Sequence, residues 1–286
     1  MMIAALLLTL AGEPKVTVEA PNYLVAGAPF KVRIALEAPA DGAKLEGWQL
    51  TPAAFTLDGK ALAEHGSEAA LELKAGERKT VEVDLGSKLT AKADFQLAWG
   101  SLPARKVRVL EAAPKDLKFT DEAALPTAEL TKYWVLLRTN RGDILTEFWP
   151  DVAPNHVRNF LDLCYTGFYD GKIFHRVIPG FMIQGGDPTG TGSGSGPRML
   201  KAEFSSKKHE AGVLSMARSS SPDSASCQFF VMHKAYPSLD GQYTCFGKLV
   251  SGLDVVDKIV NSKRNSQDKP FEPQTILKAS VLKVAK

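Results

Sequence analysis

A permanent cation and a neutral amide lie in one short apolar stretch of the sequence, residues 167–187. Arg176 is followed closely by Phe181, Met182 and Gln184. An arginine stays protonated in proteins and presents its donors in a fixed fork, and a donor in a dry pocket acts more strongly than one in water. Such a group can stabilise a twisted peptide bond without making or breaking a covalent bond. Our hypothesis is that this stretch recognises proline and rotates the peptide bond before it.

Other kinds of chemistry find little support in this chain. His209 and Glu210 begin like a zinc-binding helix motif, but Val213 occupies the place of the second histidine ligand. The glycine-rich run at 188–197 lacks the Gly-Lys-Ser/Thr ending of a phosphate-binding loop, so we expect a mobile surface loop beside the site. Bond rotation needs neither a metal nor a cofactor, and we expect none.

The second half of the chain has the pattern of a barrel that would hold this site. Apolar runs on either side of an Asn-Arg-Gly-Asp turn predict a hairpin over residues 133–149. Pro154 and an apolar stripe that ends at Cys164 predict a helix, and residues 253–260 predict a second one. Further short apolar runs predict more strands. Many strands with two helices favour a closed barrel with helices over its ends.

The first half shows the alternation that is typical of strands with one buried face. Phe30, Val32, Ile34 and Leu36 alternate with Lys31, Arg33, Ala35 and Glu37, and turn residues separate several similar runs. We expect an immunoglobulin-like β-sandwich at residues 13–112, a linker at 113–130 and the barrel domain at 131–286. The sandwich offers no chemistry, and we expect it to bind an unidentified protein.

Charge and hydropathy limit the partners and the location. The net charge of +3 is too small to indicate nucleic-acid binding. Residues 1–130 carry 15 Lys and Arg against 18 Asp and Glu, whereas the totals leave 20 against 14 for residues 131–286, which favours two domains of different character.

Residues 1–12 form an apolar run shorter than the roughly 20 residues that span a bilayer. We expect an export signal and a periplasmic or cell-envelope location. The alternative is a first β-strand or a frayed end in a cytoplasmic protein. No later segment is expected to span a membrane.

Residues 174–187, Phe-His-Arg-Val-Ile-Pro-Gly-Phe-Met-Ile-Gln-Gly-Gly-Asp, resemble the signature of the cyclophilins, which are peptidyl-prolyl cis-trans isomerases. Three further blocks follow in the family's order: Leu214–Ala217, Ser226–Phe230, and Leu239–Gly241 with Phe246 and Gly247. The Met-Ala-Arg that starts the polar loop at 216–218 and the Pro-Asp-Ser at 222–224 are most similar to bacterial members. The resemblance covers residues 131–286. It implies an eight-stranded antiparallel barrel capped by two helices, without a cofactor, which accelerates rotation of Xaa-Pro bonds in folding proteins.

The resemblance also implies roles for single residues. It matches Arg176 to the catalytic arginine and Gln184 to a glutamine beside the substrate carbonyl. It implies that the remaining substrate-binding residues are Phe181, Met182, Ala217, Arg218, Ser219, Gln228, Phe230, Leu239 and Tyr243.

Two positions depart from the family's pattern. Ser238 stands where many members have a tryptophan that is associated with tight cyclosporin binding, so we expect weak cyclosporin binding. Tyr243 stands where many have a histidine, and it can still wall a pocket and donate one hydrogen bond. Proline-containing polypeptides are the expected partners. The alternative to an enzyme is a non-catalytic module that grips such segments, but the presence of Arg176 favours catalysis.

Overall fold

The computed structural model describes residues 7–8, 14–45, 52–62, 71–86, 89, 91–100 and 102–285. These residues form two compact units: an N-terminal unit that ends at Glu111 and includes Val284 and Ala285, and a C-terminal unit from Ala112 to Lys283. No helix in the described part of the chain is long and apolar enough to cross a membrane. The expected export signal lies outside the described residues except for β1 (Leu7–Leu8), which pairs with β2 (Lys15–Glu19).

The N-terminal unit is a sandwich of two β-sheets. One sheet has the strand order β1-β2-β4-β9, the other has the order β3-β11-β10-β6-β7, and β5 pairs with β8. The remaining bounds are β3 (Tyr23–Val25), β4 (Lys31–Glu37), β5 (Ala43–Leu45), β6 (Phe55–Leu57), β7 (Lys60–Ala61), β8 (Leu71–Leu73), β9 (Arg78–Asp84), β10 (Phe95–Trp99) and β11 (Arg105–Ala112). The first sheet groups β2, β4 and β9, and the second groups β6, β10 and β11. Strands A, B, E and C, F, G of an immunoglobulin sandwich are grouped in the same way, and the immunoglobulin-like assignment of this unit stays a prediction.

Alternating burial explains why these segments form strands. In β4, Val32, Ile34 and Leu36 are at most 2% exposed, whereas Lys31 and Arg33 face solvent. The buried face of β4 contacts the same apolar cluster as Phe95 and Val107 of the second sheet. A period of two therefore places one face of each sheet in the core between them.

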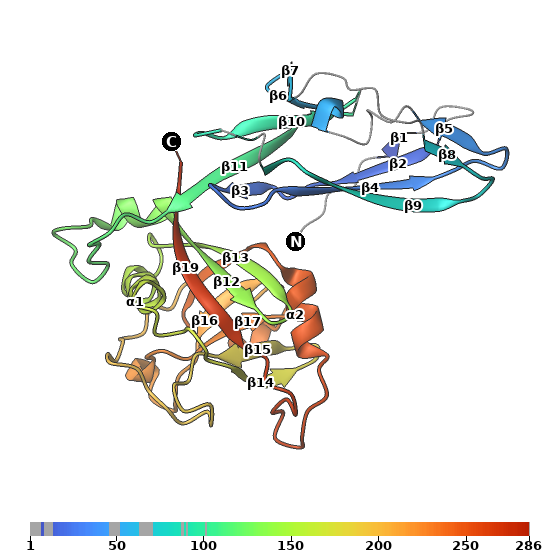
Figure 1. Ribbon diagram of the computed structural model, residues 1–286. Helices are drawn as coiled ribbons and strands as arrows, with labels where there is room; N and C mark the ends of the chain where they lie inside the picture. Colours follow the sequence, from blue (N-terminus) through green and yellow to red (C-terminus); the bar gives the residue numbers. More distant parts are fainter. Residues whose placement is uncertain are drawn as a thin grey trace. The chain divides into compact units, whose positions relative to one another are not determined.

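The C-terminal unit is a closed antiparallel barrel of eight strands, as predicted (Figure 1). Its strand order is β14-β15-β17-β16-β18-β13-β12-β19, and a bridge between Ile173 and Thr275 joins the two ends of that order. The bounds are β12 (Tyr133–Thr139), β13 (Gly142–Phe148), β14 (Phe174–Ile178), β15 (Met182–Gly185), β16 (Val213–Met216), β17 (Phe229–Met232), β18 (Cys245–Ser251) and β19 (Ile276–Val284). Short 3-10 turns lie at Thr127–Lys132, Pro222–Ser224 and Pro237–Leu239.

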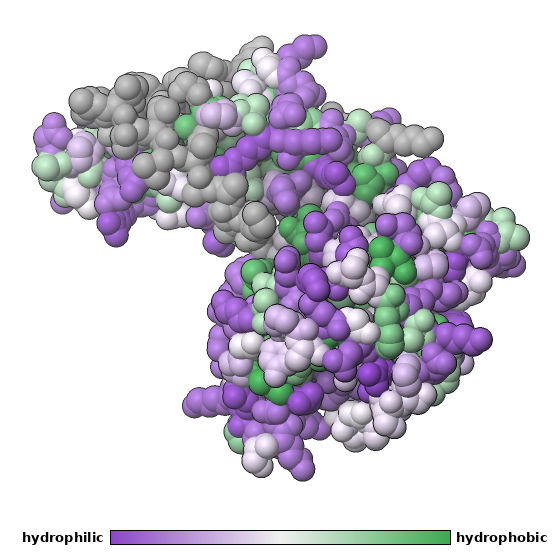
Figure 2. All heavy atoms as spheres, turned by 180° about the vertical axis from the view of Figure 1, so that it is seen from behind, coloured by the Kyte–Doolittle hydropathy of each residue, from purple (hydrophilic) through white to green (hydrophobic). Residues whose placement is uncertain are grey.

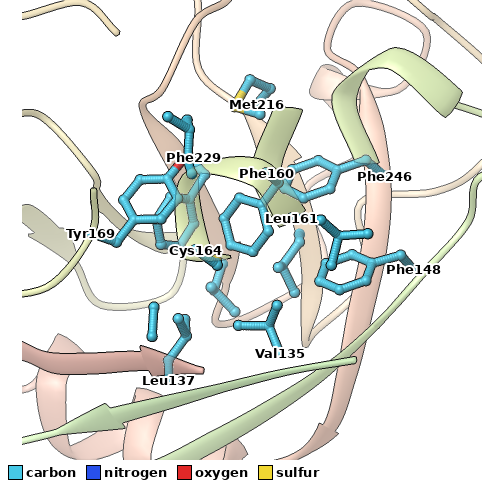
Figure 3. Close-up of a cluster of buried hydrophobic side chains, with 14 of the residues drawn as sticks. Val135, Leu137, Phe148, Phe160, Leu161, Cys164, Tyr169, Met216, Phe229 and Phe246 are labelled. Atoms are coloured by element: carbon cyan, nitrogen blue, oxygen red, sulfur yellow. The ribbon is translucent and has the colours of Figure 1, made fainter. Parts of the chain in front are cut away.

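Two helices add their apolar faces to the barrel core. They are α1 (Pro154–Tyr165) and α2 (Leu253–Val260), and both begin where the sequence predicts them. Figure 3 shows Phe160 and Leu161 of α1 among Phe148, Phe229 and Phe246 of the strands. The ring of Phe160 meets that of Phe229 edge to face at 5.0 Å, a favourable arrangement of aromatic quadrupoles.

Residues 113–130, which the sequence predicts to be a linker, pack against the barrel unit. Phe119 and Leu130 are fully buried in the barrel's core cluster. The ring of Phe119 contacts Tyr133 edge to face at 5.2 Å. Arg158 of α1 is itself buried and donates hydrogen bonds to the carbonyls of Phe119 and Leu125. Isolated apolar residues anchor this segment to the barrel without any helical or strand period, which is why the sequence shows no pattern here.

The face of the barrel unit that Figure 2 shows is largely polar. On the face drawn in Figure 2, hydrophilic side chains cover most of the rounded C-terminal unit, and hydrophobic ones form only separate patches. Scattered apolar residues of this kind are normal for a protein surface.

Candidate active site

A row of cross-strand neighbours sets out the candidate site. Arg176 of β14 pairs with Gln184 of β15, Gln184 pairs with Phe230 of β17, and Phe230 pairs with Ser215 of β16. The next residues in these strands, among them Val177, Ile183 and Val231, point into the barrel core. Side chains alternate between the faces of a strand, so one set of strands supplies both the core and the wall of the site.

A β-bulge directs Arg176 to the outer face. The pairing of β14 with β15 steps from Phe174–Gly185 to Arg176–Gln184, which leaves His175 as an extra residue. Without the bulge, Phe174 and Arg176 would lie on the same face. Phe174 is instead fully buried in the core while 44% of the Arg176 side chain is exposed. Bulges that redirect a side chain in this way are common next to active sites.

A cavity of about 350 Å³ opens on the outer face beside Arg176. It brings together nine of the eleven residues that the sequence singles out: Arg176, Phe181, Met182, Gln184, Ala217, Arg218, Phe230, Leu239 and Tyr243. Its apolar wall is a cluster of its own, separate from the barrel core, in which Met182 and Phe230 are buried and Phe181, Ala217, Leu239 and Tyr243 pack against them. A cavity with an apolar wall on one side and convergent polar groups on the other is a common form of ligand site.

The guanidinium group of Arg176 is only loosely held. Its nearest ionic partner is Asp268, whose Oδ2 lies 3.9 Å from the arginine Nε, and Asp268 also faces Arg264 at 3.4 Å. The side chain of Arg176 forms no hydrogen bond with any described residue. The cation is thus oriented by one distant carboxylate, and its donors remain available at the edge of the apolar wall.

Buried polar groups hold the apolar wall from behind. The ring of His209 stacks on that of Phe230 at 6.1 Å, and its Nδ1 and Nε2 lie 3.0 Å from Asp240 Oδ1 and 3.1 Å from Ser215 Oγ. Burial lowers the pKa of His209 and outweighs the opposite effect of Asp240. A neutral His209 with both nitrogens engaged fixes the plane against which Phe230 rests.

Ser219 and Gln228 line a second cavity rather than the first. This cavity measures about 220 Å³ and shares Gln184, Gly192, Ala217 and Arg218 with the first one. Gln228 links Gln184 of β15 to the glycine-rich segment. Its Oε1 accepts a hydrogen bond from Gln184 at 3.0 Å, and its Nε2 donates to the carbonyls of Gly192 and Gly194.

The glycine-rich segment beside the site is tied to buried Asp187. The two carboxylate oxygens of Asp187 accept hydrogen bonds from the backbone nitrogens of Thr189 and Thr191 at 2.7 and 3.1 Å. Burial opposes ionisation of Asp187, but bonds from Thr189, Gly194 and Gly192 outweigh it and lower the pKa of the carboxyl to about 2. Gly186 has a φ of +87°, and a Cβ there would lie 2.6 Å from the carbonyl oxygen of Cys227, so the sharp turn into Asp187 needs glycine.

Several residues of the site could not be identified from the sequence. Thr191, Gly192, Gln267 and Lys269 come from loops, and His175 owes its place to the bulge. Neither ring nitrogen of His175 has a partner among the described residues. Burial lowers the pKa of His175, and Lys269 and Arg176 add to this effect against Asp187.

Tyr236 adds an aromatic neighbour outside the cavity lining. It is 42% exposed, and its ring lies 4.4 Å from that of Phe181. The only signal in the sequence is an aromatic residue shortly before Leu239, which is too weak to single it out.

Comparison with known proteins places this unit in a family. Residues 134–281 match the family model of the cyclophilin type peptidyl-prolyl cis-trans isomerases. The chain is 46% identical over 154 residues to a peptidyl-prolyl cis-trans isomerase of Schizosaccharomyces pombe, which covers 52% of this chain and 98% of the relative. It is also 46% identical over 142 residues to one of Arabidopsis thaliana, covering 48% of this chain and 88% of that protein.

A solved structure agrees with this assignment. A cyclophilin type isomerase of Cryptosporidium parvum, studied in the presence of the dipeptide Ala-Pro, matches with a TM-score of 0.50 and 36% identity over 52% of this chain and 98% of its own. The fold, the family model and the relatives agree with the resemblance noted in the sequence. The chain belongs to the cyclophilin family of peptidyl-prolyl cis-trans isomerases.

Proposed function

We propose that the first cavity rotates Xaa-Pro bonds by holding the proline ring against its apolar wall and stabilising the twisted amide with Arg176. A planar peptide bond resists rotation by about 18–20 kcal/mol because its C–N bond has partial double-bond character. In the twisted state the prolyl nitrogen becomes pyramidal and can accept a hydrogen bond. Arg176 would donate that bond only in this state, and an interaction confined to the transition state lowers the barrier.

The single observation that carries this proposal is the position of Arg176. It is a permanent cation with free donors, directly beside buried Met182 and Phe230. The apolar wall would take the proline ring and exclude water, which strengthens a hydrogen bond made there. Gln184 has a second amide hydrogen beyond the one given to Gln228, and it would donate to the carbonyl next to the proline. The Ala-Pro dipeptide in the Cryptosporidium parvum study supports the substrate class.

The test is the exchange rate of a proline-containing tetrapeptide with the wild-type chain and with Arg176→Ala. The wild type should accelerate exchange, and Arg176→Ala should lower kcat/KM about 10²–10³-fold, the usual cost of removing one transition-state donor. Lys258→Gln on α2 removes an exposed cation that lines neither cavity and should keep full activity. Unchanged turnover in Arg176→Ala, with the same fold by circular dichroism, would contradict the role of Arg176. A wild type that binds the peptide without accelerating exchange would instead support a non-catalytic binding module.

A further inference from the structure

The two cavities of the candidate site are lined by positive charge without negative charge. Arg176, Arg218 and Lys269 line the first cavity, and Arg218 also lines the second. No aspartate or glutamate lines either cavity within the described part of the chain. A pocket lined by one sign of charge raises the local concentration of ligands of the opposite sign.

Two of these cations have no carboxylate to neutralise them. Lys269 donates to the carbonyl of Gly190 at 3.0 Å, and Arg218 donates to three carbonyls, those of Gln242, Ser219 and Ser220, at 2.9–3.2 Å. Neither forms an ion pair with any described residue. Arg176 differs, because Asp268 faces it at 3.9 Å.

The neighbouring acids do not cancel this charge. Asp268 lies between Arg176 and Arg264. Asp187 is 1% exposed, and its oxygens accept hydrogen bonds from backbone nitrogens of the glycine-rich segment. His175 and Tyr243 also line the first cavity, and a neutral imidazole and a neutral phenol add no negative charge.

Arg218 is also held in a fixed position. Its guanidinium carbon lies 4.6 Å above the ring of Tyr243, and its Nε and Nη1 are anchored on the three carbonyls. Its Nη2 makes no hydrogen bond to any described residue. A pre-oriented guanidinium with a free nitrogen loses little entropy on binding a carboxylate.

We propose that this isomerase prefers prolyl segments with an acidic side chain next to the proline, and that Arg218 and Lys269 provide the preference. This inference rests on the proposed function and names its substrate class. The attraction acts on the planar and the twisted substrate alike, so it lowers KM and leaves kcat unchanged. An exposed ion pair raises affinity about threefold. Two such pairs give about a tenfold ratio between a glutamate peptide, which can form them, and a lysine peptide, which cannot.

The experiment compares three tetrapeptides that differ only in carrying Glu, Gln or Lys before the proline, and a second set with the change after the proline. With the full chain at low salt, kcat/KM should decrease in the order Glu, Gln, Lys in at least one set. The peptides should differ in KM and not in kcat. The ratio between the Glu and Lys peptides should be smaller at 0.5 M salt. The double variant Arg218→Gln/Lys269→Gln should bring the Glu-to-Lys ratio close to one. Lys258→Gln, which removes a cation outside both cavities, should keep the wild-type ratio.

The outcomes separate this inference from the proposed function. Equal kcat/KM for all peptides, or a ratio that survives in the double variant, overturns the charge preference while isomerisation itself stands. If Lys258→Gln lowers the Glu-to-Lys ratio of kcat/KM as much as the double variant does, the effect comes from the net charge of the protein, and the proposal is also overturned. Absence of exchange with every peptide, including the neutral Gln peptides, contradicts the proposed function.

Discussion

The two units of this chain bury different kinds of side chain. Every buried side chain described in the N-terminal sandwich is apolar, whereas the C-terminal barrel also buries thirteen polar or charged ones. A buried polar group costs free energy unless it is hydrogen-bonded, so the barrel must position a partner for nearly every one of them. The sandwich needs only shape complementarity in its core.

Four of the buried polar groups of the barrel lie at or directly behind the candidate site. His209 and Ser215 lie behind Phe230, and Asp187 holds the glycine-rich segment. His175, whose nitrogens lack partners among the described residues, lines the cavity itself. The difference teaches that the barrel, unlike the sandwich, spends part of its polar burial on supporting a site, whereas Arg158 and others support only the fold.

The largest effect should come from removing one core phenylalanine in each unit. Phe160 of the barrel and Phe55 of the sandwich are both fully buried, and replacing either with alanine should cost about 3–5 kcal/mol of unfolding free energy. Thermal unfolding with parallel rate measurements would check this. In Phe160→Ala, isomerase activity should decrease in proportion to the fraction of barrel that remains folded. In Phe55→Ala, the barrel stays folded and activity should persist. Equal loss of activity in both variants would break the contrast between the units.

A smaller loss of unfolding free energy is expected when residues 113–130 are released from the barrel. Arg158 donates to the carbonyls of Phe119 and Leu125 at 3.0 and 2.8 Å and to Thr127 Oγ at 3.0 Å. Arg158→Ala leaves these buried acceptors unpaired and should cost about 3 kcal/mol. Urea denaturation gives the stability, and limited proteolysis should show new cleavage within residues 113–130. A loss below about 1 kcal/mol with unchanged cleavage would return this segment to the status of a linker.

The smallest of these effects should depend on pH. The pKa of Asp187 is about 2 in the folded chain, below its ordinary value of 3.8, so its contribution is present above pH 4 and is lost as the pH falls towards 2. Asp187→Asn should therefore cost about 2 kcal/mol at pH 7. The gap between wild type and variant, measured by urea denaturation, should narrow from pH 4 to pH 2. A gap that stays constant over this range would show that the carboxylate charge does not hold the segment.

Regular periods in the sequence predict much of this architecture. Alternation at residues 30–37 gives the sandwich strand, and the stripe after Pro154 gives α1, because burial of one face leaves a fixed spacing. The signature stretch and the blocks after it identify nine residues that the structure brings to one cavity.

Features without a period could not be predicted. The bulge at His175 changes which face a residue occupies, and no residue type marks it. Loop residues such as Lys269 reach the cavity through tertiary contacts alone. Phe119 and Arg158 lie far apart in the sequence, and their contact depends on how the segment before the barrel folds back on α1.

The most direct test of the contrast is the isomerisation rate of the barrel unit by itself. A fragment of residues 112–286 retains the cavity, the buried polar groups and the segment held by Arg158. Its kcat/KM for an Xaa-Pro tetrapeptide should lie within about twofold of the full chain, because all the groups proposed for catalysis belong to this unit. A folded fragment that is more than about tenfold slower would contradict the account, since the sandwich would then contribute to the reaction.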